Sequence, residues 1–387
     1  MNVIKEKDSL YIANTYARFP VAIKKGKGAI LYGFDKKEYI DLTSGIGVNS
    51  FGIADKVWQK AIKEQIKKVQ HTSNLYYTEP SIKLAELIIN KTGLRKIFFC
   101  NSGAEANECA IKTARKYAMD KKGKEYFNII TLKDSFHGRT ITTLSATGQD
   151  HYHELFNPLT SGFLYAEKNI ESVEQLVKEN KVAGVMIEIV QGEGGVIPLD
   201  KDFLVKLEEL CKKEDILLII DEVQTGNGRT GKLYAYMNYG LTPDIITTAK
   251  GLGGGLPIGA CIFNEKTEKV LGFGDHGSTF GANPVCANGA LSIMERLTDE
   301  FLDEVNKKSE YIFNFFKGKK GVIAVDGLGL MIGIKIEREV KEVIKECIER
   351  GVLCLSAKDK LRLLPPLNIQ MKELVKALNV IEEVLAK

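Results

Sequence analysis

The chain has 387 residues, of which 44% are hydrophobic and 27% charged, and these proportions are typical of a soluble globular protein. Its length exceeds the size at which one hydrophobic core keeps growing, so we expect one large domain with a smaller one attached. The formal net charge of +4 is too small to favour a nucleic-acid surface or a membrane patch as the partner.

The first residues and the cysteines predict the compartment and the absence of metal. The opening MNVIKEKDSL lacks the apolar core of a signal peptide, and no run of about 18 apolar residues follows, so we expect a cytoplasmic protein. The seven cysteines contain no CxxC pair, which argues against a disulfide framework or a zinc knuckle. His151 and His153 form an HxH pair without a further ligand nearby in sequence, so we predict no metal site.

In chain order, the first 50 residues contain GKGAILYGFDKKEYIDL, a pattern of strands and turns that predicts a small antiparallel meander. From about residue 95 to 265, short β-branched runs alternate with amphipathic stretches. This pattern is typical of repeated βα units and predicts an α/β fold with a mainly parallel sheet of seven strands. The predicted strands are residues 96–100, 128–132, 162–166, 182–189, 216–220, 244–248 and 259–263.

Helices are predicted between and after these strands. The segment DFLVKLEELCKK (202–213) places five apolar side chains on one helical stripe that can cover the sheet. After residue 290 we predict a helix over 290–317, short strands near Ile323 and Met331, and a last helix from about Gln370. Neither end of the chain can bury a core alone, so we expect residues 1–50 and 286–387 to build one small α+β domain beside a large domain over 51–285.

Unusual polar and glycine-rich segments follow the predicted strands, where a parallel α/β sheet binds its ligand. NSGAEAN (101–107) lies between a strand and a helix, and the backbone N–H groups of such a turn suit a phosphate. An ordinary helix cap by Asn101 or Ser102 explains the same segment equally well.

Two further segments carry charged side chains at strand ends. The apolar run ILLII ends in Asp221 and Glu222, so one carboxylate points to the site and the other away. A carboxylate there can keep a pyridinium ring protonated, although an isolated acid more often caps a helix. Lys250 follows the strand DIITTA and precedes GLGGGLPIG; a partly desolvated lysine beside such a turn can form an imine with a carbonyl, although most lysines are solvated surface groups.

A competing interpretation is a P-loop nucleotide hydrolase that uses Gly226 to Lys232, GNGRTGK. The next residue is Leu233, where a Mg²⁺-binding Ser or Thr is required. The candidate acids Asp221 and Glu222 also precede the loop, whereas those of P-loop enzymes follow it. No GxGxxG follows an early strand, which excludes a dinucleotide-binding motif.

Taken together, several blocks in one order resemble the class III, or ω-amino, aminotransferases. The blocks are NSGAEANE, FHGRT, EIVQGEGGV, DEVQTGNGRTG, AKGLGGGLPIG, HGSTFGANP and LRLLPPL. Within that class, TYARFPVAI, HTSNLYYTEP and the short length look most like acetylornithine aminotransferases. The resemblance implies the type I pyridoxal-phosphate fold, a homodimer with shared active sites, and pyridoxal 5′-phosphate as the cofactor.

The resemblance also implies roles for individual residues around that cofactor. Lys250 would hold it as a Schiff base and move a proton at the substrate carbon, and Asp221 would bind the pyridine nitrogen. The other cofactor-binding residues would be Ser102, Gly103 and Ala104 at the phosphate with Thr279 of the second subunit, Phe136 and Val223 on the two ring faces, and Gln224 near the 3′-oxygen.

The substrates implied are a small amino donor and 2-oxoglutarate, bound by Arg139, Glu193, Arg362, Ser278 and Tyr16. Arg139 and Arg362 suit the two carboxylates of glutamate, since a guanidinium binds a carboxylate through two parallel hydrogen bonds. A permanently free Arg362 would favour α-amino acids in both half-reactions. In the family, the glutamate that matches Glu193 pairs with the arginine that matches Arg362 and swings aside for glutamate, so the resemblance implies the same gate here.

The position of Gly45 favours an acylated donor, because ornithine aminotransferases tend to carry a tyrosine there. The resemblance then implies transfer of the δ-amino group of N2-acetylornithine to 2-oxoglutarate, a step of arginine biosynthesis, with ornithine, succinylornithine or 4-aminobutyrate as alternative donors. A silent relative without cofactor would need broken key positions, and here they are intact. One departure is the segment GVNSFGIADKV, where the family usually carries a GHxHP-like motif.

Overall fold

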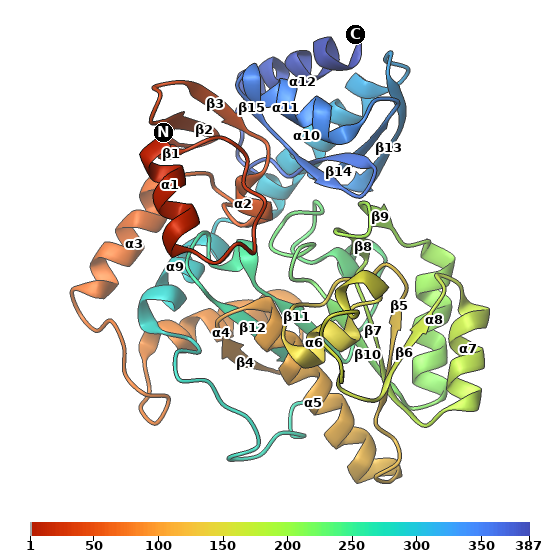
Figure 1. Ribbon diagram of the computed structural model, residues 1–387. Helices are drawn as coiled ribbons and strands as arrows, with labels where there is room; N and C mark the ends of the chain where they lie inside the picture. Colours follow the sequence, from red (N-terminus) through yellow and green to blue (C-terminus); the bar gives the residue numbers. More distant parts are fainter. Residues whose placement is uncertain (1) are drawn as a thin grey trace.

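The computed structural model describes residues 2–387, and its centre is a seven-stranded sheet (Figure 1). In spatial order the strands are β4 (Lys96–Cys100), β12 (Gly259–Phe263), β11 (Ile245–Thr248), β10 (Leu217–Asp221), β7 (Val182–Ile187), β5 (Asn128–Leu132) and β6 (Phe163–Ala166). Only β12 runs antiparallel to its neighbours. The prediction of seven mainly parallel strands is therefore confirmed, and each lies within two residues of its expected range.

Both faces of this sheet are buried, which explains why its strands read as continuous apolar runs. Along β10, Leu217 and Ile219 belong to the core on one face, whereas Leu218 and Ile220 belong to the core on the other. Helix α5 (Gly103–Lys122) covers the first face, and α8 (Lys201–Lys213) contributes to the second beside α7 (Ile170–Glu179). Alternate strand residues thus anchor helices on both sides.

Helix α8 illustrates why these segments become helical. Asp200 caps its first turn by accepting hydrogen bonds from the backbone nitrogens of Asp202 and Phe203, at 2.9 and 3.1 Å. The predicted apolar stripe is buried along its whole length, from Phe203 to Cys211. Capping and burial therefore act on the same segment, and the burial is that of the apolar stripe that the sequence predicted.

The two ends of the chain meet in a second region beside the large sheet (Figure 1). The predicted meander is present as β1 (Ile23–Lys27), β2 (Ile30–Gly33) and β3 (Glu38–Asp41), and β15 (Val352–Leu353) adds to it parallel to β3. A further sheet has the order β13 (Val322–Leu328), β14 (Met331–Ile336), β17 (Lys360–Leu363) and β16 (Leu355–Ala357). We retain 1–50 with 286–387 and 51–285 as proposed domain limits.

The single helix predicted over 290–317 is wrong. The structure has α9 (Pro284–Met294) and α10 (Asp299–Phe316), separated by a short break. Thr298 starts α10 by accepting a hydrogen bond from the backbone nitrogen of Phe301, and acidic residues follow in the first turn. The capping residues therefore start a new helix within an apolar pattern that otherwise continues.

The remaining elements complete the two regions. They are α1 (Asn2–Tyr11), α2 (Ser44–Gly47), α3 (Lys56–Ile66), α4 (Glu79–Thr92), α6 (Ile141–Ala146), α11 (Val340–Glu349), α12 (Met371–Leu385), β8 (Val190–Gln191), β9 (Ile197–Pro198) and the 3-10 helices η1 (Asp150–Tyr152), η2 (Ala235–Asn238) and η3 (Lys250–Leu252). The last helix begins within a residue of its predicted start. No helix in residues 2–387 combines the length and apolar character needed to cross a bilayer.

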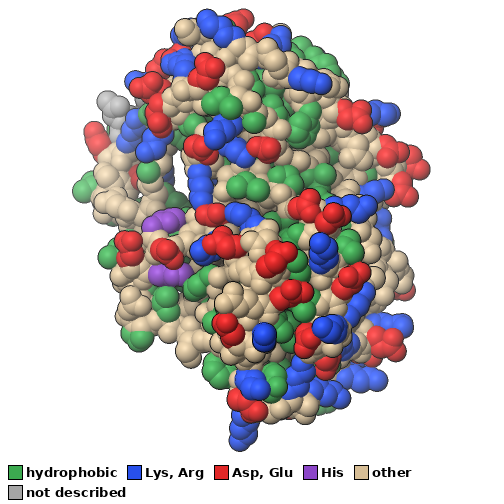
Figure 2. Space-filling model, turned by 90° about the vertical axis from the view of Figure 1, so that its right-hand side faces the viewer, with side chains coloured by type: hydrophobic (Ala, Val, Ile, Leu, Met, Phe, Trp, Pro, Cys, Tyr) green, Lys and Arg blue, Asp and Glu red, His purple; other side chains and the backbone are tan. Residues whose placement is uncertain are grey.

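Lys and Arg side chains are intermixed with Asp and Glu side chains over the face of the molecule shown in Figure 2. All seven cysteines are free thiols, and six of them are buried, the exception being the partly buried Cys286. The described part of the chain holds no cluster of three or more His, Cys, Asp or Glu side chains suited to a metal ion.

Candidate active site

A cavity of about 430 Å³ opens where several strands of the large sheet end. Its walls include the segments that follow β4, β5, β7, β10 and β11, which lie far apart in the sequence. Nine of the residues singled out in the sequence line it: Ser102, Gly103, Ala104, Phe136, Glu193, Asp221, Val223, Gln224 and Lys250. The cavity thus lies at the sheet edge where a ligand was expected.

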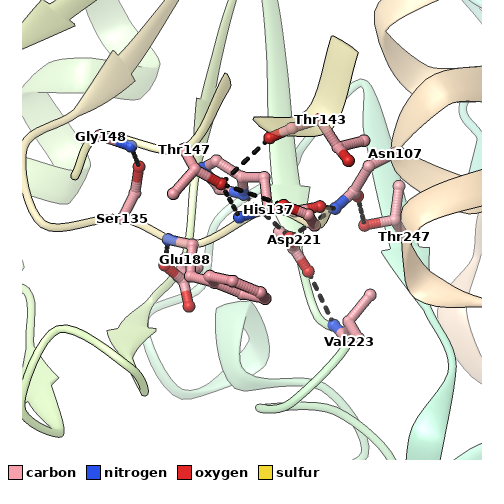
Figure 3. Close-up of polar contacts among 12 residues, drawn as sticks. Asn107, Ser135, His137, Thr143, Thr147, Gly148, Glu188, Asp221, Val223 and Thr247 are labelled. Atoms are coloured by element: carbon pink, nitrogen blue, oxygen red, sulfur yellow. Dashed lines mark hydrogen bonds and ion pairs between the residues drawn. The ribbon is translucent and has the colours of Figure 1, made fainter. Parts of the chain in front are cut away.

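Asp221, at the end of β10, is held by hydrogen bonds to both of its carboxylate oxygens (Figure 3). Oδ2 accepts from Nδ2 of Asn107 at 2.7 Å and lies 2.9 Å from Nδ1 of His137, while Oδ1 accepts from the backbone nitrogen of Val223 at 3.0 Å. Its neighbour Glu222 points away from the cavity and accepts from the backbone nitrogen of Tyr236. As predicted, one acid faces the site and the other does not.

His137 and Asn107 fix the orientation of this carboxylate. The His137 side chain is fully buried; burial alone would lower its pKa, but the hydrogen bond and charge of Asp221 outweigh burial, so the pKa is raised. Asn107 also donates to the carbonyl of His137 and accepts from the hydroxyl of Thr247 on β11. The network therefore joins helix α5, strand β11 and the carboxylate.

Lys250 begins the short helix η3 with a backbone φ of 43°, in the left-handed region that is uncommon for a lysine. Burial lowers the pKa of its ammonium group, and the nearby carboxylates of Glu193 and Asp221 oppose that shift. A lowered pKa increases the fraction of neutral amine near neutral pH, and the neutral amine is the form that attacks a carbonyl.

The N-terminus of α5 forms one wall of the cavity. Ser102 is its N-cap and accepts from the backbone nitrogen of Glu105 at 3.2 Å, and the first-turn residues Gly103 and Ala104 line the cavity. First-turn N–H groups have no partner within their helix, so they attract an anion. A Cβ on Gly103 would lie 2.6 Å from Val223, so this close approach requires glycine.

Arg362, on β17, approaches the cavity from the region built by the chain ends. Its Nη1 lies 2.6 Å from Oε1 of Glu193 and 3.5 Å from Oε1 of Gln224, and only 3% of the residue is exposed. Burial would raise the pKa of Glu193, but the charge and hydrogen bond of Arg362 outweigh it and lower the pKa. Within residues 2–387 the buried Nε of Arg362 has no hydrogen-bond partner, which leaves a donor for a ligand.

Four other predicted residues lie outside this cavity. The guanidinium of Arg139 is exposed and stacks over the rings of Phe136 and Tyr152, at 5.8 and 4.8 Å from their centroids. Ser278 and Thr279 line a neighbouring hollow that shares Asn101 with the cavity. Tyr16 lies in a separate surface groove, so the structure of one chain does not bring it to the site.

The GNGRTGK segment lacks the geometry of a P-loop. A phosphate-binding loop leads into a helix N-terminus, whereas this one is followed only by the short 3-10 helix η2. The guanidinium of Arg229 is buried and donates to the carbonyls of Leu330 and Pro365, at 3.1 and 2.6 Å, and Lys232 is exposed. The segment is a structural loop that connects the two regions, which removes the observation behind the nucleotide-hydrolase alternative.

Sequence reasoning missed three polar residues of the cavity: Asn107, His137 and Glu188. Two of them stand in segments already singled out: His137 directly follows Phe136, and Asn107 lies one helical turn after Gly103 on the same face of α5. Glu188 lies within the predicted strand 182–189 but directly follows β7 in the structure, which ends at Ile187. It accepts from the backbone nitrogen of Phe136 at 2.9 Å, and burial raises its pKa to about 7. A carboxylate near the end of a predicted strand was the signal available for Glu188.

Comparison with known proteins agrees with this site. The model of the family "Aminotransferase class-III" matches residues 11–385. The chain belongs to the class-III aminotransferases. An acetylornithine aminotransferase of Haemophilus ducreyi is 48% identical over 99% of this chain and 98% of its own.

Solved structures confirm the predicted fold. The ornithine aminotransferase of Toxoplasma gondii superimposes with a TM-score of 0.95 at 29% identity, over 100% of this chain and 94% of its own. The N-acetylornithine aminotransferase of Stenotrophomonas maltophilia does so with a TM-score of 0.85 at 32% identity, over 98% of each chain. The aminotransferase therefore has the type I pyridoxal-phosphate fold, and its cofactor is pyridoxal 5′-phosphate.

The residues of the cavity fit this cofactor. An N-terminus of a 20-residue helix suits the phosphate, the buried Asp221 suits a protonated ring nitrogen, and Lys250 suits the aldehyde. Gly103 approaches Val223 so closely that a Cβ at position 103 has no space, so glycine keeps this wall of the cavity free of a side chain. When bound, the cofactor supplies an aldehyde that takes up amino groups and a ring that accepts electrons from the substrate carbon.

Proposed function

We propose that this enzyme transfers the δ-amino group of N2-acetylornithine to 2-oxoglutarate, producing N-acetylglutamate 5-semialdehyde and glutamate by a ping-pong mechanism. The reaction is a step of arginine biosynthesis. The single observation that carries the proposal is the pairing of Arg362 with Glu193 beside Lys250, because it explains how one site serves two different amines. The names of the similar proteins from H. ducreyi and S. maltophilia support the donor.

The proposed division of labour follows from where the side chains lie. Lys250 holds the cofactor and, once released, its Nζ moves a proton to or from the reacting carbon of the substrate. Asp221, fixed by His137 and Asn107, keeps the ring nitrogen protonated. Ser102, Gly103 and Ala104 bind the phosphate, while Phe136, Val223 and Gln224 contact the ring.

The two arginines separate the two half-reactions. Acetylornithine reacts at its far end, so its α-carboxylate lies distant from Lys250 and can bind the exposed Arg139. Glutamate reacts at its α-amine, so its α-carboxylate binds Arg362 and its side-chain carboxylate binds Arg139. For glutamate, Glu193 must therefore leave Arg362; for acetylornithine the Glu193–Arg362 pair stays closed.

The choice of an acylated donor rests on Gly45, whose missing side chain leaves space where a tyrosine would stand in ornithine aminotransferases. Gly45 adopts a φ of 66°, and Val48, three residues on, lines the cavity. Ornithine, succinylornithine and 4-aminobutyrate are the competing donors.

We also propose a homodimer in which Thr279 of the second subunit completes the phosphate site and Ser278 and Tyr16 reach substrate. Thr279 lies outside the cavity of its own chain, in a hollow bordered by Ser278 and Phe280. Exposed apolar side chains occur near this hollow and in the 66–77 segment, including Phe280 at 58%, Tyr76 at 71% and Tyr77 at 98%. Such exposure is typical of a surface that another chain covers. The cytoplasmic location remains a prediction.

The test is a visible absorption spectrum of the cofactor-loaded enzyme with each candidate donor at the same concentration. We expect acetylornithine to remove the visible band fastest and glutamate to remove it also. If another donor removes the band and acetylornithine does not, the proposed substrate is wrong while the reaction class stands. If no amine changes the band, the proposed function as a whole is wrong.

A further inference from the structure

Three backbone carbonyls around Lys250 accept hydrogen bonds from side chains that lie outside its turn. Nδ2 of Asn227 donates to the carbonyl of Ala249 at 3.2 Å, and Oγ of Ser50 donates to that of Gly251 at 3.2 Å. The indole Nε1 of Trp58 donates to the carbonyl of Gly253 at 3.0 Å. Alternate carbonyls from 249 to 253 are thus each bound, and we call these three donors the turn clamp.

The turn needs such support because its backbone is unusual. Lys250 has a left-handed φ of 43°, and Gly254 and Gly255 follow at 57° and 118°. A lysine held in the left-handed region persists only where its surroundings impose it. The clamp supplies that restraint from three separate parts of the chain.

Trp58 is the aromatic member of the clamp, and it comes from a helix. It is the only tryptophan of the chain and lies on α3, whose first turn is capped by Asp55. Asp55 also pairs with Arg296 at 2.9 Å, which fixes the start of the helix against the segment after α9. The indole of Trp58 lies against the glycine turn, since a Cβ on Gly254 would be 3.3 Å from Nε1 of Trp58.

This corner of the structure coincides with the one departure from the family pattern noted in the sequence. The segment GVNSFGIADKV stands where a GHxHP-like motif is usual, and its residues Gly52 to Asp55 line a second cavity of about 200 Å³ together with Trp58. Gly255 lines both this cavity and the active-site cavity, so one backbone turn separates the two.

We propose that Trp58, together with Ser50, is a positioning residue that sets the backbone of Lys250 and hence the placement of its Nζ in both half-reactions. The inference rests on the proposed role of Lys250. Because the same lysine serves both amines, loss of the Trp58 bond affects both half-reactions alike. This separates Trp58 from Glu193, whose loss alters one half-reaction relative to the other.

The test compares the holoenzyme with Trp58→Phe, which keeps an aromatic ring and removes the donor. We expect kcat to fall about two- to tenfold with little change in KM, the range expected for one neutral hydrogen bond. The pH midpoint of the visible band of the loaded enzyme should move, because that midpoint depends on the environment of Nζ. Amide hydrogen exchange across residues 249–256 should be faster in Trp58→Phe than in the unmodified protein when both are measured without cofactor.

Asn288→Ala is the matched control, since Nδ2 of Asn288 donates to the carbonyl of Ala61 on α3 at 2.8 Å, whereas the Trp58 indole donates to the turn itself. It should leave kcat, the midpoint and exchange across 249–256 unchanged. If Trp58→Phe also leaves kcat and the midpoint unchanged, or if Asn288→Ala moves them equally, the proposal is wrong.

Ser50→Ala is a second variant that tests the proposal if Trp58→Phe does not fold. It should lower kcat and move the pH midpoint of the visible band in the same direction as expected for Trp58→Phe. An unshifted Ser50→Ala would then refute the proposal. Reductive labelling of Lys250 in the unmodified enzyme tests the proposed function separately. A labelled Lys250 with an unaffected Trp58 variant would overturn only the positioning role.

Discussion

Replacing Glu193 with alanine should favour glutamate over acetylornithine as the amino donor. In the structure Oε1 of Glu193 lies 2.6 Å from Nη1 of Arg362, and a carboxylate substrate must break this contact before it binds that arginine. Alanine removes the competitor and leaves the guanidinium free. The change should therefore lower the barrier for glutamate and leave that for a donor that never uses Arg362 unchanged.

The size of the effect follows from the kind of bond that is released. A hydrogen bond to a charged group contributes about 1.5–3 kcal/mol net, which corresponds to roughly 10- to 150-fold in a rate or binding constant. Arg362 is 3% exposed and its remaining contact to Gln224 is long, at 3.5 Å, so little else compensates for the lost carboxylate. We expect the ratio of the two half-reaction efficiencies to move by at least about tenfold, at the lower end of that range.

Single-turnover measurements of the visible band give kcat/KM for each half-reaction separately. Glu346→Ala is a suitable control, because Glu346 also pairs with an arginine at 2.6 Å but lies far from the cavity, on α11. Glu346→Ala should leave the ratio as it is in the unmodified enzyme. A ratio that is also unchanged in Glu193→Ala would refute the gating role.

Three further predictions follow from buried groups. Asp221→Asn should lower kcat about 100-fold or more, because an amide provides no charge opposite the ring nitrogen; steady-state rates beside the surface control Asp215→Asn check this, and a loss below tenfold would contradict it. Burial raises the pKa of Glu222 from 4.5 to about 7, so the folded state binds more protons than the unfolded state between these values and the free energy of unfolding falls as pH rises from about 4.5 to 7. Glu222→Gln should flatten that slope in denaturation curves between pH 5 and 8, and an equal slope in both proteins would contradict this origin. Arg229→Ala should lower the free energy of unfolding by about 3 kcal/mol, because it removes buried charge-assisted hydrogen bonds. Lys232→Ala is the control and should leave stability and activity unchanged. A loss of activity in Lys232→Ala would instead support a nucleotide-binding role for this loop.

Much of the large sheet could be predicted because its information is local. The inner strands β7, β10, β11 and β12 are short apolar runs buried at every position, and a covering helix such as α8 carries its own apolar stripe. The short edge strands of the two four-stranded sheets could not be predicted in this way. Strands β15 and β16 have two and three residues and exist only through pairing with β3 and β17, so no local pattern marks them.

The helix break at Thr298 shows a different limit. The apolar spacing that suggested one helix over 290–317 persists on both sides of the break, and the capping signal of Thr298 and Asp299 is short. Periodicity alone does not decide between a continuous helix and two helices packed in sequence. The local hydrogen bond of the cap decides it here.

The covalent and charged groups of the candidate site could be predicted from the sequence, but the side chains that hydrogen-bond to them could not. Lys250 and Asp221 stand at strand ends, which the sequence displays directly. The sequence does not display the partners of Asp221 in this way, because Asn107 is 114 positions away and His137 is 84 positions away. Which polar side chain reaches a buried carboxylate depends on how helices pack against the sheet, and that packing is not written in any one segment.

The central claim is that Lys250 carries the cofactor through its side-chain nitrogen. Borohydride reduction of the loaded enzyme, followed by peptide mass mapping, tests it most directly. We predict a single reduced adduct on the peptide that contains Lys250, and no adduct in Lys250→Ala. An adduct on a different lysine, in an enzyme that still turns over with Lys250 replaced, would contradict the account.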